Sequence, residues 1–288
     1  GLALAAKGCF GNSGVDLVAL IRDEAKGQEE LQKQLDHFVH KHKIAKRLCH
    51  LVLNPKDYQL LLVEAPEVPE EDLREAVRWK IKDLVSMPVD RAVVDVFHLP
   101  ADGNKSSKKM LYVVASDLKR IQSMIALVNQ SGLTLSSIDI PEMAMRNMSC
   151  VVGSELQSRG VGVVRLCEGA GVVSLFRNGN LYLSRQFKLN YGGGLLDELP
   201  DDSLGLEVQR SLDYYERQMG MSPPAVLYLC GENMSEDKIT QELSRSLTVP
   251  VKFLDVAASV SFADNVDEGM VQLCMGALGS AYREDVLQ

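Results

Sequence analysis

The stretch GVVRLCEGAGVVSLFRNGNLYLSRQFKL, residues 162–189, decides the fold class. It carries three apolar runs, at 162–166, 171–176 and 181–189. Asn178-Gly179 separates the last two runs, and Asn-Gly favours the type I′ turn that joins two antiparallel strands. The stretch therefore predicts three consecutive strands connected by tight turns.

Helical and strand patterns alternate after this stretch. The apolar spacing predicts helices over 205–219, 235–247 and 266–282. Strands are expected between them, over 225–230 and 249–256. The last of these helices is apolar on nearly every side, which is typical of a helix buried between layers.

The first half of the chain shows the same mixture of elements. A chain of 288 residues is long enough for two cores, and Ser158-Arg159-Gly160 marks a break between the halves. We therefore expect an α/β protein with mixed sheets and two lobes, at 1–150 and 151–288. In the first half, the patterns predict strands over 15–22, 48–53, 58–64, 93–99, 110–115 and 133–140, and helices over 28–42, 69–85 and 117–132 and from Pro141.

The composition narrows the classes of function. The formal charge of -8 argues against proteins that bind nucleic acid or anionic lipid surfaces, since both functions need basic patches. No apolar run approaches the roughly 20 residues that span a bilayer, and no signal-peptide pattern is visible. We therefore expect a cytoplasmic protein that does not insert directly into a membrane and reaches one only through a partner.

Cysteine and histidine spacing does not indicate a metal centre. His37, His40 and His42 lie close together, but only Asp36 is near enough to add a further ligand. We expect this cluster to be a polar helix end, and the neighbouring basic run 41–47 to be a solvated surface. The cysteines form no CxxC pair and suit reduced thiols in a cytoplasmic protein: Cys9, Cys49, Cys150, Cys167, Cys230 and Cys274.

Several stretches resemble PilM, a member of the actin/Hsp70/FtsA superfamily. The resemblance is strongest at LEVQRSLDYYERQ, residues 206–218, and extends to the hairpin 162–185 and to LYLCGE at 227–232. EAVRW at 75–79 and the last helix, 269–283, are also similar to the family. The resemblance covers nearly the whole chain.

This resemblance implies a two-lobed actin-like ATPase (RNase H-like) fold. It implies a subdomain of the FtsA/PilM type inserted at about 48–105, and a reduced second-lobe subdomain (IIB), because few residues separate Gly192-Gly193-Gly194 from the helix at 206. It also implies a scaffold of type IV pilus assembly that binds the N-terminal cytoplasmic peptide of a PilN-like inner-membrane protein. The pilus motor ATPase is a further candidate partner.

The position of the chain within the group is inferred in the same way. Its length and the missing membrane span favour the MshI branch, which serves the MSHA pilus. The cytoplasmic part of the type II secretion protein GspL is the nearest competitor, and it would make the chain an adaptor for a secretion ATPase.

The nucleotide site of the family is degenerate at matching positions. Cys9 and Arg165 stand where active members carry an Asp that positions Mg²⁺, and Cys167 stands where they carry a Gly. Neither a thiol nor a guanidinium is a ligand for a hard cation. Glu232 follows Gly231 in the adenosine turn, where a carboxylate near the phosphates is unfavourable. The degenerate pocket would comprise Gly11, Asn12, Ser13, Arg165, Gly169, Gly231 and Glu232.

We therefore expect a pseudo-ATPase with no cofactor, for which Mg-ATP is the disfavoured alternative. Arg165 could instead hold a phosphate directly, without metal. A genuine ATP-dependent enzyme of this fold remains the competing class.

Trp79 is the only tryptophan of the chain. On a helix over 69–85 it falls on the polar side with Glu75, away from the apolar stripe, and Arg78 lies beside it. Either a neighbouring element covers the indole, or the indole is exposed and anchors a partner. The PilM resemblance favours the second reading, with Glu75, Arg78 and Trp79 as partner-binding residues.

Overall fold

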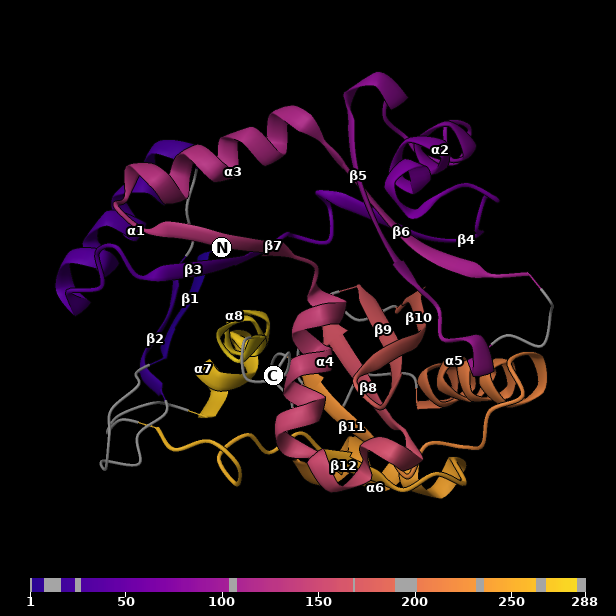
Figure 1. The fold of residues 1–288 in the computed structure, drawn as a ribbon. Helices are drawn as coiled ribbons and strands as arrows, with labels where there is room; N and C mark the ends of the chain where they lie inside the picture. Colours follow the sequence, from indigo (N-terminus) through magenta and orange to yellow (C-terminus); the bar gives the residue numbers. More distant parts are fainter. Residues whose placement is uncertain are drawn as a thin grey trace. The chain divides into compact units, whose positions relative to one another are not determined.

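The computed structural model describes residues 2–7, 17–23, 27–103, 108–167, 169–189, 201–231, 236–262 and 268–283 (Figure 1). Contacts divide the chain into two compact units. One unit combines residues 1–24 with 142–288, and the other is the continuous segment 25–141. Residues 1–24 therefore group with the second half of the chain. The expected division into lobes at 1–150 and 151–288 remains a prediction.

A five-stranded sheet forms the centre of the first unit, in the order β10-β9-β8-β11-β12 (Figure 1). β8, β9 and β10 are antiparallel neighbours, whereas β11 runs parallel to β8 and β12 parallel to β11. Asn178 and Gly179 have φ values of 49° and 70°, so the predicted hairpin turn is confirmed. The strands are β8 (Val161–Cys167), β9 (Ala170–Arg177), β10 (Asn180–Lys188), β11 (Val226–Gly231) and β12 (Val251–Phe253).

Helices and one further strand pair complete this unit. The antiparallel strands β1 (Leu2–Lys7) and β2 (Leu17–Asp23) lie beside α8 and α7, respectively. A 3-10 turn, Ser154–Arg159, precedes β8. The helices are α4 (Pro141–Val152), α5 (Asp201–Asp213, continued by the π-helical turn Tyr214–Gln218), α6 (Glu236–Ser246), α7 (Glu268–Leu273) and α8 (Met275–Ala281).

α4 and α8 pack at backbone distance. A Cβ atom on Gly279 would lie 2.1 Å from the carbonyl oxygen of Ala144, so only glycine fits there. The side chain of Asn147, which is fully buried, donates from Nδ2 to the carbonyl oxygen of Gly279 at 2.8 Å. The small residues that interleave the apolar sequence of α8 therefore permit this close contact.

The second unit contains two small sheets. β4 (Tyr58–Glu64), β6 (Met110–Asp117) and β5 (Ala92–His98) form an antiparallel sheet with β6 in the middle. β3 (Leu48–Val52) pairs in parallel with β7 (Thr134–Asp139). The helices are α1 (Gln28–His42), α2 (Leu73–Lys80) and α3 (Leu118–Gln130), with 3-10 turns at Glu70–Asp72, Val89–Arg91 and Ala101–Gly103.

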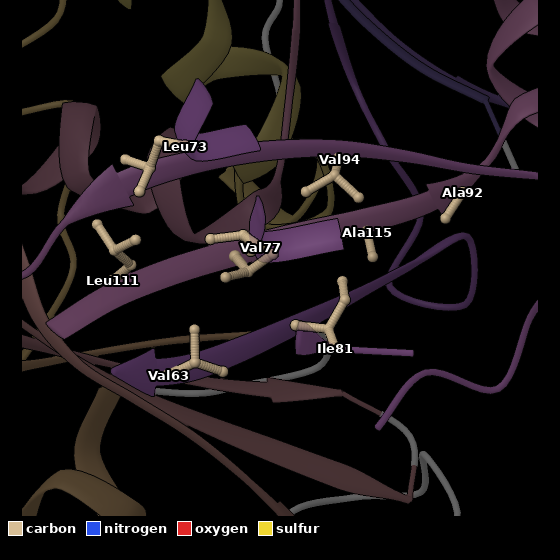
Figure 2. Close-up of a cluster of buried hydrophobic side chains, with 9 residues drawn as sticks. Val63, Leu73, Val77, Ile81, Ala92, Val94, Leu111 and Ala115 are labelled. Atoms are coloured by element: carbon tan, nitrogen blue, oxygen red, sulfur yellow. The ribbon is translucent and has the colours of Figure 1, made fainter. Parts of the chain in front are cut away.

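One face of the three-stranded sheet packs against α2 (Figure 2). Val77 of α2 and Ile81, which follows the helix, are both fully buried against the sheet. Alternate residues of the three strands complete a cluster that removes its apolar surface from water. The cluster consists of Val63, Leu73, Val77, Ile81, Ala92, Val94, Leu111, Val113 and Ala115.

The structure corrects several expected element boundaries. The helix predicted over 69–85 is only a 3-10 turn and the eight residues Leu73–Lys80, and Leu84 is 55% exposed instead of buried. The last helix is interrupted at Cys274. The strand at the start of the chain, β1, was not expected from the mildly apolar sequence there. No helix in the described part of the chain is both long and apolar enough to span a membrane.

Candidate functional site

The outer surface of α2 carries the three residues expected to bind a partner. Leu73 and Val77 face the sheet, and because a helix turns 100° per residue, Glu75 and Trp79 point away from it. The side chain of Trp79 is 59% exposed, which answers the alternative left open by the sequence: the indole is not covered. A large exposed aromatic side chain on a rigid helix is a typical anchor for a protein partner.

One hydrogen bond orients the indole of Trp79. Its Nε1 donates to Oε1 of Glu75, one turn earlier, at 3.1 Å. The second oxygen of this carboxylate, Oε2, lies 3.6 Å from Nη1 of Arg78. Glu75, Arg78 and Trp79 therefore form one connected polar and aromatic group, which we call the α2 surface. Leu84, just beyond the helix, adds a second exposed apolar side chain in the same segment of the chain.

Charged pairs surround the sheet beneath α2. Arg74 lies 3.0 Å from Asp95 and Lys108 lies 2.9 Å from Glu64, with all four side chains substantially exposed. The hydrogen bond from Lys108 lowers the pKa of Glu64, and the charge of Lys108 acts in the same direction. Exposed pairs of this kind contribute little stability. They do keep the surroundings of the α2 surface polar.

The structure brings together three of the seven residues expected to form the nucleotide pocket. β8 and β11 are adjacent and parallel, with Arg165 opposite Cys230, so both strands end at the same edge of the sheet. Gly231 lies at the end of β11, and Gly169, with φ of 72°, lies in the turn from β8 to β9. Gly11, Asn12, Ser13 and Glu232 lie outside the described residues.

The described residues at this sheet edge carry one guanidinium and two thiols. Residues 165–167 and 229–231, at the ends of the two strands, include no carboxylate, and Glu168 and Glu232, which follow directly, lie outside the described residues. Burial raises the pKa of the Cys230 thiol to about 12, although the nearby Arg165 opposes this shift, so the group stays a neutral thiol. Mg²⁺ prefers oxygen ligands, which neither a neutral thiol nor a guanidinium supplies.

A glutamine that the sequence analysis did not single out occupies part of this edge. Gln272 of α7 is buried; its Oε1 accepts from the backbone N–H of Gly231 at 3.4 Å, and its Nε2 donates to the carbonyl oxygen of Leu254 at 3.1 Å. One side chain thus joins the ends of β11 and β12. The signal for it is a single amide within the otherwise apolar run 270–275.

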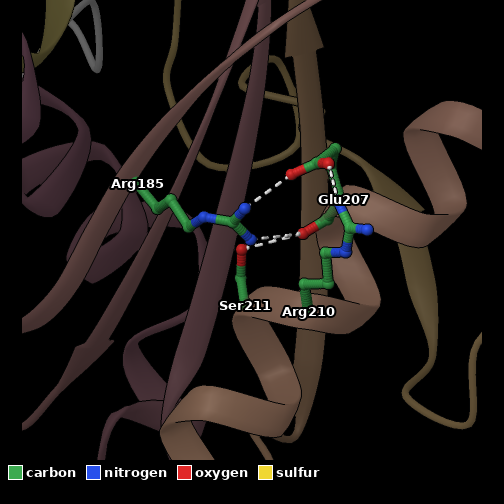
Figure 3. Close-up of polar contacts among 4 residues, drawn as sticks. All are labelled: Arg185, Glu207, Arg210 and Ser211. Carbon is green, nitrogen blue, oxygen red and sulfur yellow. Dashed lines mark hydrogen bonds and ion pairs between the residues drawn. The ribbon is translucent and has the colours of Figure 1, made fainter.

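A polar group connects β10 to α5, the helix on which the family resemblance is strongest (Figure 3). Nη2 of Arg185 lies 2.7 Å from Oε2 of Glu207, and Nη1 of Arg210 lies 2.5 Å from the other oxygen of this carboxylate. Ser211 donates from its hydroxyl to the carbonyl oxygen of Glu207 at 2.9 Å. Since both oxygens of the half-buried carboxylate face guanidinium groups, this set fixes the helix on the sheet and leaves little capacity for a ligand.

Comparisons with known proteins identify the fold. No protein-family model and no curated protein sequence matches the chain. Among solved structures, a PilM-PilN type IV pilus biogenesis complex superposes with a TM-score of 0.74 at 17% sequence identity, covering 99% of this chain and 95% of that one. The chain therefore has the actin-like ATPase fold, as the sequence resemblance predicted.

Two further structures are more distant. The cytoplasmic domain of EpsL, an inner-membrane component of the type II secretion system of Vibrio cholerae, gives a TM-score of 0.49 at 11% identity, over 82% of this chain and 86% of that one. A protein with an actin-like ATPase fold and unknown function from Bacteroides thetaiotaomicron gives 0.47 at 10% identity, over 89% and 85%. Both TM-scores are too low to support an inference.

Proposed function

We propose that this protein is a cytoplasmic scaffold of type IV pilus assembly that binds the N-terminal cytoplasmic peptide of a PilN-like inner-membrane protein. The observation that carries the proposal is the superposition of nearly the whole chain on a structure of the PilM-PilN complex. The exposed indole of Trp79 supports it, because a scaffold needs a surface that its own fold leaves uncovered. Within pilus systems, we assign the chain to the MSHA type, as an MshI-like protein.

The proposed partner surface is the α2 surface. Aromatic side chains with a fixed orientation lose little conformational entropy on binding, and the Glu75 hydrogen bond already fixes the indole of Trp79. Arg78 and Glu75 flank the indole with opposite charges, which suits a peptide carrying both apolar and charged residues. The inner-membrane protein would thereby hold the scaffold at the membrane.

We further propose that the scaffold is a pseudo-ATPase. The neutral thiol of Cys230, the guanidinium of Arg165, and the amide of Gln272 on Gly231 support this proposal. Calorimetric titration with Mg-ATP tests it. We expect no saturable binding tighter than about 100 μM; tighter binding would overturn the pseudo-ATPase proposal, and an assay of ATP turnover would then test for an enzyme.

Tryptophan fluorescence tests the scaffold proposal, because Trp79 is the only tryptophan. Titration with a tryptophan-free N-terminal peptide of the PilN-like protein is expected to shift its emission as the indole leaves water. The substitution Trp79→Ala is expected to weaken the binding free energy of the peptide, measured by calorimetry, by about 2 kcal/mol or more. Leu206→Ala, which removes a 51% exposed apolar side chain from α5, is the matched control and should leave the affinity unchanged.

The outcomes separate the alternatives. If the peptide binds and Trp79→Ala does not weaken this binding, the protein would still be a scaffold, but its partner surface would lie elsewhere than on α2. Absence of peptide binding, together with co-purification of a secretion ATPase, would instead favour the GspL-like adaptor.

A further inference from the structure

The last turn of α1 and the loop that follows it, up to β3, concentrate positive charge on an otherwise acidic protein. Residues 37–50 include Lys41, Lys43, Lys46 and Arg47 and no Asp or Glu, whereas the chain as a whole carries a formal charge of -8. All four side chains are exposed. Among the residues that the structure describes, none of the four forms an ion pair. We call these four residues the basic loop.

The loop has a defined conformation. The backbone N–H of Lys46 donates to the carbonyl oxygen of Gly132 at 2.7 Å, and the N–H of Thr134 donates to the carbonyl oxygen of Arg47 at 2.9 Å. These bonds fix the basic loop against the turn between α3 and β7. Residues 129–138, which include that turn, contain no Asp or Glu either. The positive charge is therefore held on one surface whose two loops contribute no carboxylate.

Two of the lysines occupy backbone positions that favour other residues. Lys43 and Lys46 have φ values of 53° and 64°, in the left-handed region where glycine and asparagine are less strained. The dipole of α1 accounts for a basic residue in its last turn, such as Lys41, but not for Lys46 and Arg47, which lie beyond the helix. The stability of the fold alone therefore does not explain the side chains of the basic loop.

An exposed leucine lies directly after the basic loop. The side chain of Leu48, the first residue of β3, is 64% exposed, the largest fraction among the exposed large apolar residues of the described chain. Basic side chains beside an exposed aliphatic side chain suit the interface of an anionic bilayer, where the charges meet lipid headgroups and the leucine enters the boundary of the acyl chains. A nucleic acid would favour aromatic side chains for stacking, and the loop 43–47 has none.

We propose that the basic loop and Leu48 form a site for the headgroups of anionic phospholipids, which holds this protein against a membrane surface without insertion of a helix. The overall negative charge does not prevent this contact. At physiological salt the Debye length is about 8 Å, so carboxylates elsewhere on the molecule are largely screened at the loop. On α1, the carboxylate nearest to Lys41 is the exposed Asp36, about 7.5 Å along the helix, whereas Glu29 and Glu30 in the first turn lie about 17–18 Å away.

Vesicle co-sedimentation of the full chain tests this inference, and it does not depend on a PilN-like peptide. We expect binding to vesicles of phosphatidylcholine with about 30% phosphatidylglycerol at about 0.1 M salt, and loss of binding at about 0.5 M salt. The variant Lys41→Gln, Lys43→Gln, Lys46→Gln, Arg47→Gln is expected to lower the partition coefficient on the order of 100-fold, since each basic residue near an anionic surface contributes several-fold. Leu48→Ser should lower it several-fold without a change in charge.

A second quadruple variant controls for the change in net charge. Lys56→Gln, Lys82→Gln, Lys109→Gln, Lys119→Gln removes four exposed lysines of the same unit and should bind the anionic vesicles like the unchanged protein. Equal losses from both variants, or equal binding to pure phosphatidylcholine vesicles, would overturn the proposal. Binding of the loop to a polyglutamate peptide without binding to anionic vesicles would also overturn it, in favour of an acidic protein partner.

Discussion

α2 and α8 are both short helices with apolar side chains, and they differ in what covers them. α8 lies against α4 and beside β1, and Met275, Leu278, Gly279 and Ser280 are all buried. α2 buries one face on its sheet and presents Trp79 on the other. The contrast shows that burial of one face is enough to hold a helix in place, and that the opposite, exposed face of such a helix is available to a partner. The predictions below test how sharply these surfaces differ.

The largest effect is expected on the buried side of α2. Ile81→Ala removes a fully buried side chain from the cluster in Figure 2 and should lower the free energy of unfolding by about 2–5 kcal/mol. Leu84→Ala, three residues later and 55% exposed, should change it by less than about 0.5 kcal/mol. Urea denaturation measures both. Similar losses from the two variants would remove the distinction between the covered and uncovered sides of this segment.

The next effect concerns α8. Gly279→Ala places a methyl group against the backbone of Ala144 and should cost about 2–3 kcal/mol, because backbone cannot move aside as a side chain can. Gly276→Ala, in the same helix but with no atom within 4 Å of the added Cβ, should stabilise by about 0.5–1 kcal/mol. The two substitutions should change the stability in opposite directions, so thermal unfolding distinguishes them readily. A neutral Gly279→Ala would mean that α4 and α8 are less closely packed.

A smaller effect is expected beside α8, where Gln272 of α7 joins β11 and β12. Gln272→Leu leaves the N–H of Gly231 and the carbonyl oxygen of Leu254 without their partner and should cost about 1–3 kcal/mol. Gln186→Leu, at an exposed position of β10, is the control and should change the stability by less than about 0.5 kcal/mol. If both substitutions were neutral, the hydrogen bonds of the Gln272 amide to Gly231 and Leu254 would not contribute to stability.

The smallest effect concerns the ion pair beneath α2. Because Lys108 lowers the pKa of Glu64, the pair stabilises the folded state above the ordinary pKa of the carboxyl, and this contribution disappears as the pH falls through the folded pKa. The Lys108→Met variant should therefore have a slightly lower free energy of unfolding than the unchanged protein at neutral pH, and the same free energy of unfolding in acid. Urea denaturation at the two pH values measures the difference. Lys109→Met, at the neighbouring exposed position, should show no such pH dependence.

Much of the fold followed from the sequence because local patterns agreed with the tertiary structure. The Asn178-Gly179 turn and the apolar runs on either side of it predicted β8, β9 and β10, and the helix over 28–42 has the bounds that were expected. α2 was predicted too long because Leu84 and Val85 continue its apolar spacing. The helix instead ends at Lys80, because ψ of the next residue, Ile81, is near 0°, and no proline or glycine marks this end.

The candidate site could be predicted only in part. Helical periodicity placed Trp79 on the side away from Val77, but it left open whether another element covers the indole, and only the structure shows the side chain exposed. The proximity of Arg165 to Gly231 depends on the pairing of β8 with β11, which are separated by more than fifty residues and carry no local signal of their pairing. Gln272 was missed because a glutamine in an apolar helix has no distinctive spacing, and its role appears only once the ends of β11 and β12 are adjacent.

The pairing of β1 with β2, and their positions beside α8 and α7, have a consequence for synthesis on the ribosome. Residues 25–141 are continuous, so this unit can fold as soon as it leaves the exit tunnel. α8 is made about 270 residues after its neighbour β1, a delay of roughly 15–50 s at an elongation rate of about 5–20 residues per second. Until α7 and α8 are made, β1 and β2 lack the helices that lie beside them in the folded protein.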